Sequence, residues 1–201
     1  MNDSTDSFRI LGISGSLRRG SFNTALIRTA GEVAPDGVEV TVFEGLRDIP
    51  PYDEDLRQQG PQVAVEKLRD AIRGADAVLF ATPEYNHGLP GVLKNAIDWV
   101  SRPVPENPLR NKPTAIMGAS GGLMGTVRAQ QQLREVLQGF TPVLHTPEVL
   151  VSSAGGRFDN QGGLTDEPTR EFVRLLVAGL VDWAEQLRPR ESEEEAQEAT
   201  G

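Results

Sequence analysis

Residues 12–23, GISGSLRRGSFN, combine small hydroxyl side chains, glycines and two arginines between an apolar run and a helix-like segment. Such a composition fits a serine nucleophile, a nucleotide phosphate loop or a simple polar turn. A serine elbow needs the pattern Gly-x-Ser-x-Gly, and Ser16 stands where its second glycine should be. It also needs a base, and the sequence offers only His87 and His145. A serine hydrolase is therefore disfavoured.

The two nucleotide-binding patterns are also incomplete in this stretch. Gly15 and Gly20 have the spacing of a triphosphate-binding loop, but Ser21 replaces the lysine that contacts the terminal phosphate oxygens. The dinucleotide fingerprint Gly-x-Gly-x-x-Gly is missing too, so Glu44 is interpreted as a solvated strand end. Two alternatives remain: a site for one phosphate monoester, or a polar turn with serine as a helix cap.

A phosphate site here would combine hydroxyl and amide groups with a fixed positive charge. The side chains available are those of Ser14, Ser16, Ser21, Thr24, Asn23, Arg18 and Arg19. The unpaired backbone N–H groups at the start of the following helix would complete the anion site.

A second stretch, residues 82–103 (TPEYNHGLPGVLKNAIDWVSRP), is the most specific of the chain. Pro83 and Gly88 restrict the backbone between a buried run and a helix. Amides along this path would face the ligand crevice, and Tyr85 offers an aromatic surface. This combination favours a flat ring as the ligand.

The flanking elements must bring these loops together. Apolar or alternating runs predict strands over residues 8–14, 38–44, 75–82, 112–119 and 142–151. Helical spacing predicts helices over residues 22–33, 63–72, 88–102, 123–137 and 166–187, and residues 45–60 are predicted as a polar loop. This alternation indicates one α/β domain with a parallel sheet. Its ligand crevice would lie beyond the carboxyl ends of the strands, at residues 14–23, 83–90 and 120–125.

Composition sets the outer limits of the function. The chain has 201 residues, 38% of them hydrophobic, a net charge of −9 and no cysteine. These values predict a single domain over residues 8–188, with disordered ends at 1–7 and 189–201, the latter acidic. The negative charge argues against nucleic acid and membrane partners. No leader or membrane-length run is found, so a cytoplasmic location is expected.

Taken together, GSLRRGSFN and PEYNHGLPGVLKNAIDW resemble the NAD(P)H-dependent FMN reductase family, the flavodoxin-like group that includes chromate, quinone and azo-compound reductases. Resemblance extends over residues 9–150 and includes residues 49–56 and 118–137. It implies a flavodoxin-like fold: a doubly wound, five-stranded parallel sheet in three α/β/α layers.

The resemblance also implies which residues bind the cofactor. The FMN phosphate would be held by Ser16, Arg18, Ser21, Asn23 and Thr24. The isoalloxazine would be bordered by Pro83, Glu84, Tyr85, Asn86 and His87. Its pyrimidine edge would lie near Ser120, Gly121 and Gly122.

The activity implied is a ping-pong hydride transfer from NADPH or NADH to bound FMN, and from there to a small-molecule acceptor. Free flavin, a quinone, an azo compound and chromate all qualify. Flavin carries the chemistry, so neither a catalytic side chain nor a metal is required, and the His87 side chain is interpreted as a bystander. A homodimer or homotetramer is expected, with residues 52–56 reaching a neighbouring subunit's site. The alternatives are a flavodoxin-like electron carrier without NAD(P)H turnover and a non-catalytic flavin binder; Arg18, Arg19 and the PEYN stretch favour the reductase.

Overall fold

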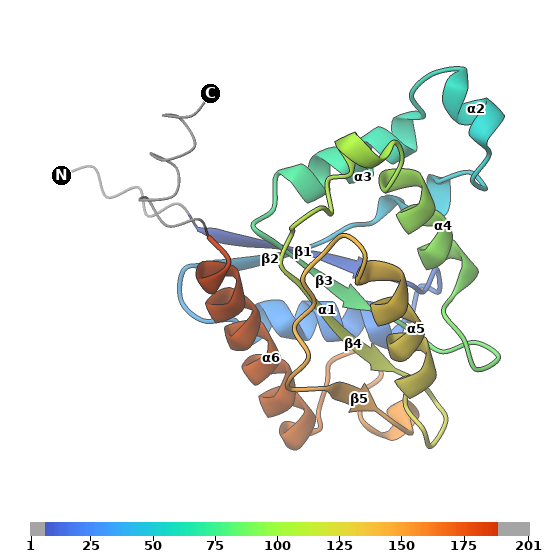
Figure 1. Ribbon diagram of the computed structural model, residues 1–201. Helices are drawn as coiled ribbons and strands as arrows, with labels where there is room; N and C mark the ends of the chain where they lie inside the picture. Colours follow the sequence, from blue (N-terminus) through green and yellow to red (C-terminus); the bar gives the residue numbers. More distant parts are fainter. Residues whose placement is uncertain (1–6, 189–201) are drawn as a thin grey trace.

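The computed structural model describes residues 7–188 (Figure 1). One sheet with the strand order β2-β1-β3-β4-β5 forms its centre, and every neighbouring pair of strands is parallel. The strands are β1 (Phe8–Ser14), β2 (Val38–Val42), β3 (Ala77–Ala81), β4 (Thr114–Ala119) and β5 (Val149–Val151). This order is that of flavodoxin-like folds, so the predicted fold class is confirmed. Residues 1–6 of the predicted N-terminal segment and the predicted acidic tail, 189–201, lie outside the described residues.

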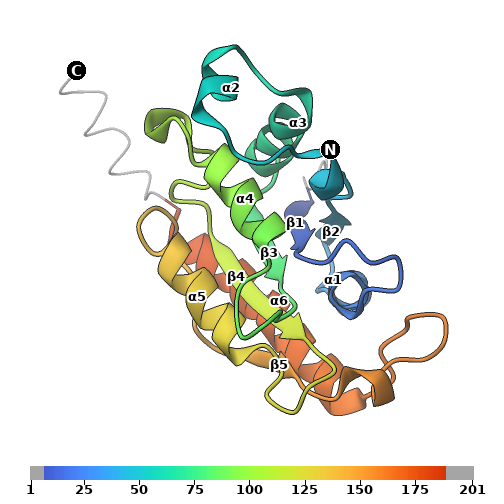
Figure 2. The ribbon, with the colours of Figure 1, turned by 90° about the vertical axis from the view of Figure 1, so that its right-hand side faces the viewer.

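Helices cover both faces of the sheet (Figure 2). Helices α1 (Phe22–Glu32) and α6 (Glu167–Gln186) share one apolar core with the sheet, which includes the fully buried Leu26 and Leu180. Helices α3 (Val63–Arg73), α4 (Gly91–Val100) and α5 (Val127–Leu137) build the second core around Phe80 and Leu93. Trp99 belongs to this second core, which confirms its predicted packing role. Strands β3 and β4 are buried along their whole length, as expected of strands covered on both sides.

Two predicted elements begin later than expected. The strand predicted over residues 142–151 is regular only at Val149–Val151, because Pro142 and Pro147 have no N–H to donate to a ladder. Before β5 the chain touches the start of β4 through a single bridge from Val143, and His145 lies in this exposed connection instead of in a strand. The helix predicted from residue 123 starts at Val127, after a left-handed Gly125 with φ of 59°.

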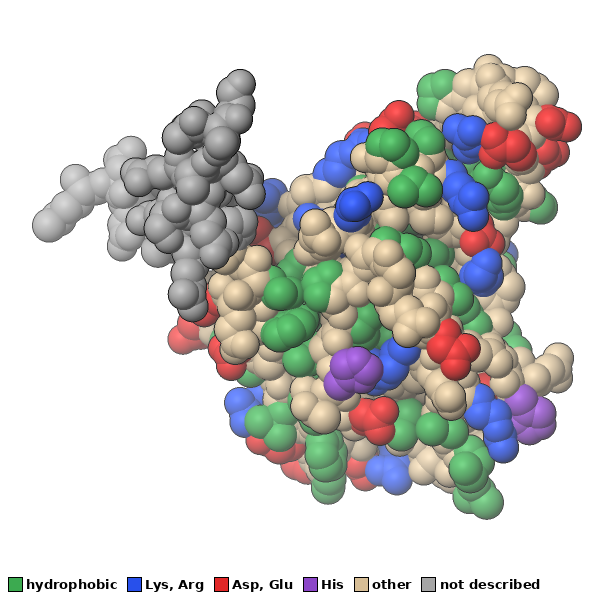
Figure 3. Space-filling view, in the orientation of Figure 1, with side chains coloured by type: hydrophobic (Ala, Val, Ile, Leu, Met, Phe, Trp, Pro, Cys, Tyr) green, Lys and Arg blue, Asp and Glu red, His purple; other side chains and the backbone are tan. Residues whose placement is uncertain are grey.

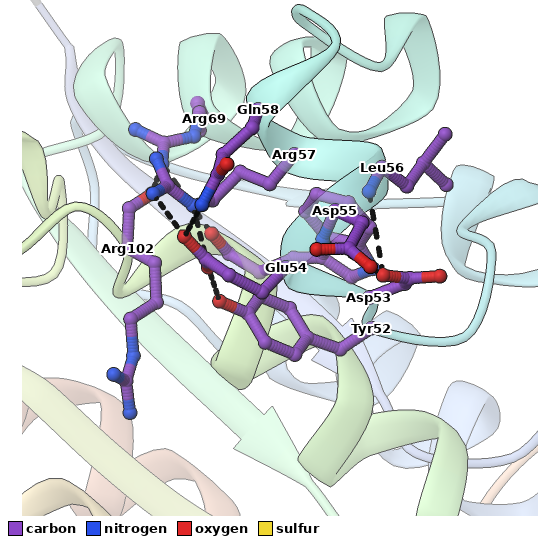
Figure 4. A network of polar contacts seen from close by, with 10 residues as sticks. Tyr52, Asp53, Glu54, Asp55, Leu56, Arg57, Gln58, Arg69 and Arg102 are labelled. Carbon is purple, nitrogen blue, oxygen red and sulfur yellow. Dashed lines mark hydrogen bonds and ion pairs between the residues drawn. The ribbon is translucent and has the colours of Figure 1, made fainter.

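A short helix, α2 (Glu54–Gln58), interrupts the segment predicted as a loop. Asp53 caps it by accepting hydrogen bonds from the N–H groups of Asp55 (2.8 Å) and Leu56 (3.3 Å). The Glu54 carboxylate then accepts hydrogen bonds from Arg57 (2.5 and 2.9 Å) and from the Tyr52 hydroxyl (2.6 Å), as Figure 4 shows. Capping and ion pairing therefore form this helix, which has no buried residue of its own.

The base of the α2 segment is fastened to α4. Asn95 accepts a hydrogen bond from the Tyr52 N–H (2.6 Å) and donates one to the Pro50 carbonyl (2.8 Å). Trp99 donates to the same carbonyl (2.8 Å), and its ring meets that of Tyr52 edge to face, with centroids 5.1 Å apart. The segment projects from the body at the upper right of Figure 1 with a fixed root.

The surface carries mixed charge. Lys and Arg side chains are interspersed with Asp and Glu on the face shown in Figure 3. Within residues 7–188, none of the helices is long and apolar enough to cross a membrane.

Two glycines set how closely the layers approach at the carboxyl end of the sheet. A Cβ on Gly12 of β1 would lie 2.2 Å from Cγ2 of Ile27, so α1 rests directly on this strand. A Cβ on Gly118 of β4 would lie 2.1 Å from Oγ1 of Thr126 and 2.4 Å from the Thr82 carbonyl oxygen. Both positions require the absence of a side chain.

Gly118→Ala is expected to lower the free energy of unfolding by roughly 1–3 kcal/mol, because the added methyl group forces β4, Thr82 and Thr126 apart. Urea unfolding monitored by circular dichroism measures this. The matched control is Gly31→Ala in α1, whose new Cβ would meet its nearest neighbours at 3.6 and 3.7 Å. The control should leave stability unchanged or raise it by up to about 1 kcal/mol. Equal stabilities for the two variants would contradict the close approach at Gly118.

Acid should loosen α2 before the rest of the fold. Hydrogen bonds from Arg57, Tyr52 and Gln58 hold the pKa of Glu54 well below its usual range. The stabilisation that results is present above the unfolded pKa of about 4.3 and is lost progressively as the pH falls toward the folded pKa. Amide exchange at residues 54–58, corrected for intrinsic rates, should therefore accelerate below about pH 4 while α3 stays protected.

Glu54→Gln provides the control for this prediction. The amide keeps the size of the side chain but cannot pair with the Arg57 charge. The variant should show weak protection of α2 already at pH 7 and little further change in acid. Protection of wild-type α2 that stays constant, relative to α3, down to about pH 2 would contradict the role given to Glu54.

Candidate functional site

Three loops meet at the carboxyl edge of the sheet. Strands β1 and β3 end at the same level, because their last residues, Ser14 and Ala81, are paired. Strand β4 is longer: Ala81 pairs with Met117, and β4 continues for two more residues to Ala119. The loops after these strands are the three that the sequence analysis selected. Side chains join two of them directly, because the Tyr85 hydroxyl donates to Oγ of Ser16 over 3.4 Å.

The first loop is shaped by its own hydroxyl groups. The buried Ser14 Oγ accepts hydrogen bonds from the Ser16 N–H (3.4 Å) and from the Thr24 hydroxyl (3.0 Å). Ser16 Oγ accepts one from the Arg18 N–H (3.4 Å). Ser21 is the N-cap of α1 and accepts from the Thr24 N–H (3.2 Å). The polar turn with a serine cap, which the sequence left as an alternative, is thus present and forms the wall of the site.

The start of α1 is suited to an anion. The N–H groups of Phe22 and Asn23 donate to no acceptor among residues 7–188, as is usual in a first helical turn. No acidic residue stands in that turn. Arg18 is exposed, and its guanidinium lies 5.0 Å from the centroid of the Phe22 ring. Within the described part of the chain, neither Arg18 nor Arg19 pairs with a carboxylate. Positive charge and free donors therefore coincide here.

Asn23 differs from the other residues predicted at this end. Its side chain is buried, with 3% exposure. Nδ2 donates to the Ala119 carbonyl (2.9 Å), and Oδ1 accepts from the Ala119 N–H (2.9 Å). Both ends of the amide are thereby engaged with β4, so it is the Asn23 backbone N–H that faces the anion position.

The second loop contains a two-residue turn. Asn86 and His87 both have left-handed backbones, with φ of 50° and 64°, and Tyr85 and Gly88 exchange backbone hydrogen bonds on either side (3.2 and 3.0 Å). This geometry resembles that of a tight hairpin turn, where asparagine is favoured. Within the described chain, the N–H groups of Asn86 and His87 have no protein acceptor. Tyr85 is 53% exposed beside them. The sequence predicted a rigid path here but not the position of the turn.

Glu84 holds this turn against α5. Its carboxylate is 8% exposed and accepts hydrogen bonds from the N–H groups of Arg128 (3.0 Å) and Ala129 (3.2 Å) in the first turn of that helix. The Arg128 guanidinium lies 3.4 Å from Oε1 of Glu84 and 3.0 Å from Nδ1 of His87. Gln132, one turn further along, accepts from the Leu89 N–H (2.8 Å). The Glu84 carboxylate is thus fully engaged, and only its backbone lies along the crevice.

Arg128 and Gln132 are site residues that the sequence analysis missed as such. Their spacing of four places them on one face of α5, which is a local signal. Nothing local indicates their partners, because these lie 41 to 44 residues away along the chain.

The third loop, residues 120–125, has free space beside one glycine and exposes two apolar side chains to solvent. The Ser120 hydroxyl donates to the Gly125 carbonyl (2.6 Å) and accepts from the Gly122 N–H (3.3 Å), which closes the loop on itself. A Cβ on Gly121 would meet no atom within 4 Å. Leu123 and Met124 follow with exposures of 86% and 59%. This loop offers an apolar surface beside a closely approachable backbone.

The combined site suits an elongated ligand with an anion at one end and a flat ring at the other. The anion position is the start of α1, and the ring position lies between the Tyr85 loop and the third loop. No cluster of metal-ligating side chains occurs within residues 7–188. A cavity of about 940 Å³ lies elsewhere, beside the start of β4, where it is lined by Arg102, Gln138 and Pro142.

Comparison with known proteins gives a consistent result. Residues 8–156 match the model of the family described as NADPH-dependent FMN reductase. An NAD(P)H-dependent FMN reductase of Pseudomonas aeruginosa is 49% identical over 186 residues, which cover 92% of this chain and 99% of the relative. A quinone reductase of Escherichia coli is 41% identical over 187 residues, with coverage of 92% and 99%.

A solved structure agrees over nearly the same length. FerB, a flavoenzyme NAD(P)H:(acceptor) oxidoreductase from Paracoccus denitrificans, superimposes with a TM-score of 0.79 at 36% identity, covering 89% of this chain and 97% of FerB. Both the family match and the extent of the relatives agree with the resemblance stated from the GSLRRGSFN and PEYNHGLPGVLKNAIDW stretches. The chain belongs to the NADPH-dependent FMN reductase family.

Proposed function

We propose that this protein is an FMN-dependent NAD(P)H oxidoreductase that passes electrons from NADPH or NADH, through FMN at the carboxyl edge of the sheet, to a small-molecule acceptor. The observation that carries this proposal is the free N-terminus of α1 beside the exposed Tyr85 ring and the unpaired N–H groups of the Asn86–His87 turn, in a chain of this family. The activity is that of an enzyme and needs no catalytic side chain, since the flavin supplies hydride chemistry when it is bound.

The phosphate end is assigned to the start of α1. Ser16, Ser21 and Thr24 shape this position, the N–H groups of Phe22 and Asn23 donate to the phosphate, and Arg18 supplies the fixed charge. A phosphate dianion is well matched to these donors because the helix dipole and the guanidinium both favour negative charge.

The ring end is assigned to the other two loops. Pro83, Tyr85 and the Asn86–His87 turn border one side, and Ser120, Gly121 and Gly122 border the other. The N–H groups of Asn86 and His87 have no protein acceptor, which favours a ligand edge that carries negative charge. Because the turn already holds these donors in place, they would stabilise that charge. Glu84 contributes by fixing the turn to α5.

The acceptor class follows from the open apolar surface and from the relatives. Leu123 and Met124 present exposed apolar groups beside the ring position, which favours a flat, weakly polar molecule. Relatives from Escherichia coli and Pseudomonas putida are named quinone reductases. We therefore place quinones first among the acceptors, with free flavin, azo compounds and chromate as further substrates of the same open site.

The proposal includes a homodimer or homotetramer in the cytoplasm, where NAD(P)H is regenerated. The projecting α2 segment supports an oligomer, because its root is fixed on α4 while its helix has no fully buried residue and packs on its own subunit only through the partly buried Leu56. In a dimer this segment would approach the flavin of the neighbouring subunit.

The test of the function is the visible spectrum of the purified protein after FMN is added and the excess removed, before and after NADPH under anaerobic conditions. Retained yellow colour that bleaches on addition of NADPH, and returns with a quinone, is the expected outcome. Retained colour that neither NADPH nor NADH bleaches would instead establish an electron carrier or a non-catalytic binder. Absence of any bound flavin, checked by fluorescence titration, would contradict the proposal as a whole.

Arg18→Ala should weaken FMN binding by about 1.5–3 kcal/mol, since it removes a charged donor to the phosphate. Riboflavin, which has no phosphate, should bind equally well to the variant and the wild type. Fluorescence titration of both flavins measures this. Arg28→Ala, which removes an exposed arginine from the second turn of α1, is the matched control and should change neither affinity. Unchanged FMN affinity in Arg18→Ala would exclude this residue from the site.

A further inference from the structure

We propose that Asn23 is a positioning residue, which joins the phosphate end and the ring end of the site into one frame without touching the cofactor through its side chain. The inference rests on the proposed function for the identity of the ligand. It concerns a residue that the sequence motif suggests as a phosphate ligand and that the structure gives a different partner.

The amide of Asn23 matches the backbone of Ala119 on both sides. Its NH2 group donates to the carbonyl and its oxygen accepts from the N–H, each over 2.9 Å. An amide side chain has a donor group and an acceptor group side by side. An ionised aspartate only accepts, and a serine has a single hydroxyl closer to the backbone, so neither presents two separate groups to Ala119. Both hydrogen bonds are buried, so leaving either Ala119 group without a partner would be costly.

Ala119 needs such a partner because β3 ends before β4 does. The last ladder contact on this side is the Thr82 N–H to the Met117 carbonyl (3.0 Å). Alternate residues of a strand donate to the same neighbour, so the next donor toward Ala119 would be Glu84, which lies beyond the end of β3 at Ala81. On its other side β4 still pairs with β5 through Ala119 and Val151. The Asn23 amide therefore takes the place that a further residue of β3 would have occupied.

The two ends of this link belong to the two ends of the site. Asn23 stands in the first turn of α1, whose N–H groups form the anion position. Ala119 directly precedes the loop with Ser120 and Gly121, which borders the ring position. The contact between Tyr85 and Ser16 also joins two of the loops, but it is exposed and long at 3.4 Å. The Asn23–Ala119 pair is thus a buried polar link between the first turn of α1 and the end of β4, in addition to the apolar packing of that helix on the sheet.

The experiment compares Asn23→Ala with the wild type for binding of FMN and of riboflavin by fluorescence titration. A positioning role predicts that the affinities for FMN and riboflavin fall by the same factor, about tenfold, because the loop after β4 is then held less firmly relative to α1. Amide exchange measured by mass spectrometry on the flavin-free protein should also accelerate about tenfold or more at residues 119–122.

Two variants serve as controls. Leu180→Ala lowers stability in the core beneath α1 and contacts neither loop, so it should leave both affinities and the exchange at 119–122 unchanged. Arg18→Ala should reduce the affinity for FMN alone. Should Asn23→Ala fail to fold, Asn23→Ser, which cannot make both hydrogen bonds, is measured in the same way with the same expected result.

The remaining outcomes overturn the inference. A loss for FMN with unchanged riboflavin binding would make Asn23 a phosphate ligand. Unchanged affinities for both flavins, or unchanged exchange at residues 119–122, would reduce the pair to an ordinary packing contact. If the wild type bound no flavin, the proposed function would fail, and the exchange measurement on the flavin-free protein would still decide whether Asn23 holds the loop.

Discussion

The end of β3 is the constraint on which the geometry of the site depends. Parallel strands share a ladder only while both continue, and Pro83 stops β3 while β4 runs on to Ala119. A buried backbone group without a partner is costly, so another element must supply the missing hydrogen bonds. Asn23 does so from α1, and the departing chain is free to form the Tyr85–Gly88 turn. A crevice opens at this point because the two strands part there.

The close approach of the layers makes this solution possible. Gly12 lets Ile27 lie against β1, and Gly118 lets β4 approach Thr82 and Thr126. With a side chain at Gly12, α1 would stand further from the sheet, and the distance from Asn23 to Ala119 would grow. With a side chain at Gly118, the start of α5 and the end of β3 would be pushed away from β4.

Much of this architecture is predictable from the sequence, and the part that is not has a physical reason. The run at residues 8–14 is predicted to its last residue, because its last five residues are buried and the run is apolar except for Arg9 and Ser14. The strand predicted over residues 142–151 is too long since its apolar pattern continues through Pro142 and Pro147. Helix α2 is missed because capping by Asp53 and pairing of Glu54 with Arg57 form it, without apolar spacing. The three loops lie at one edge of the sheet, as predicted, whereas the partners of Glu84 and Asn23 lie 44 and 96 residues away and leave no local trace.

Helices α1 and α5 both begin at this edge of the sheet, and the difference between their N-termini shows how an acidic chain holds an anion. Helix α5 is already occupied by the protein's own carboxylate, because Glu84 accepts hydrogen bonds from Arg128 and Ala129 in its first turn. Helix α1 has no acidic residue in its first turn and has Arg18 beside it. The chain has a net charge of −9, but salt screens the repulsion from charges more than about 8 Å away. The donors at α1, in contrast, would contact the ligand directly. An anionic group is therefore accommodated better at α1 than at α5, and the carboxylate at α5 serves to fix the turn on which the ring would rest.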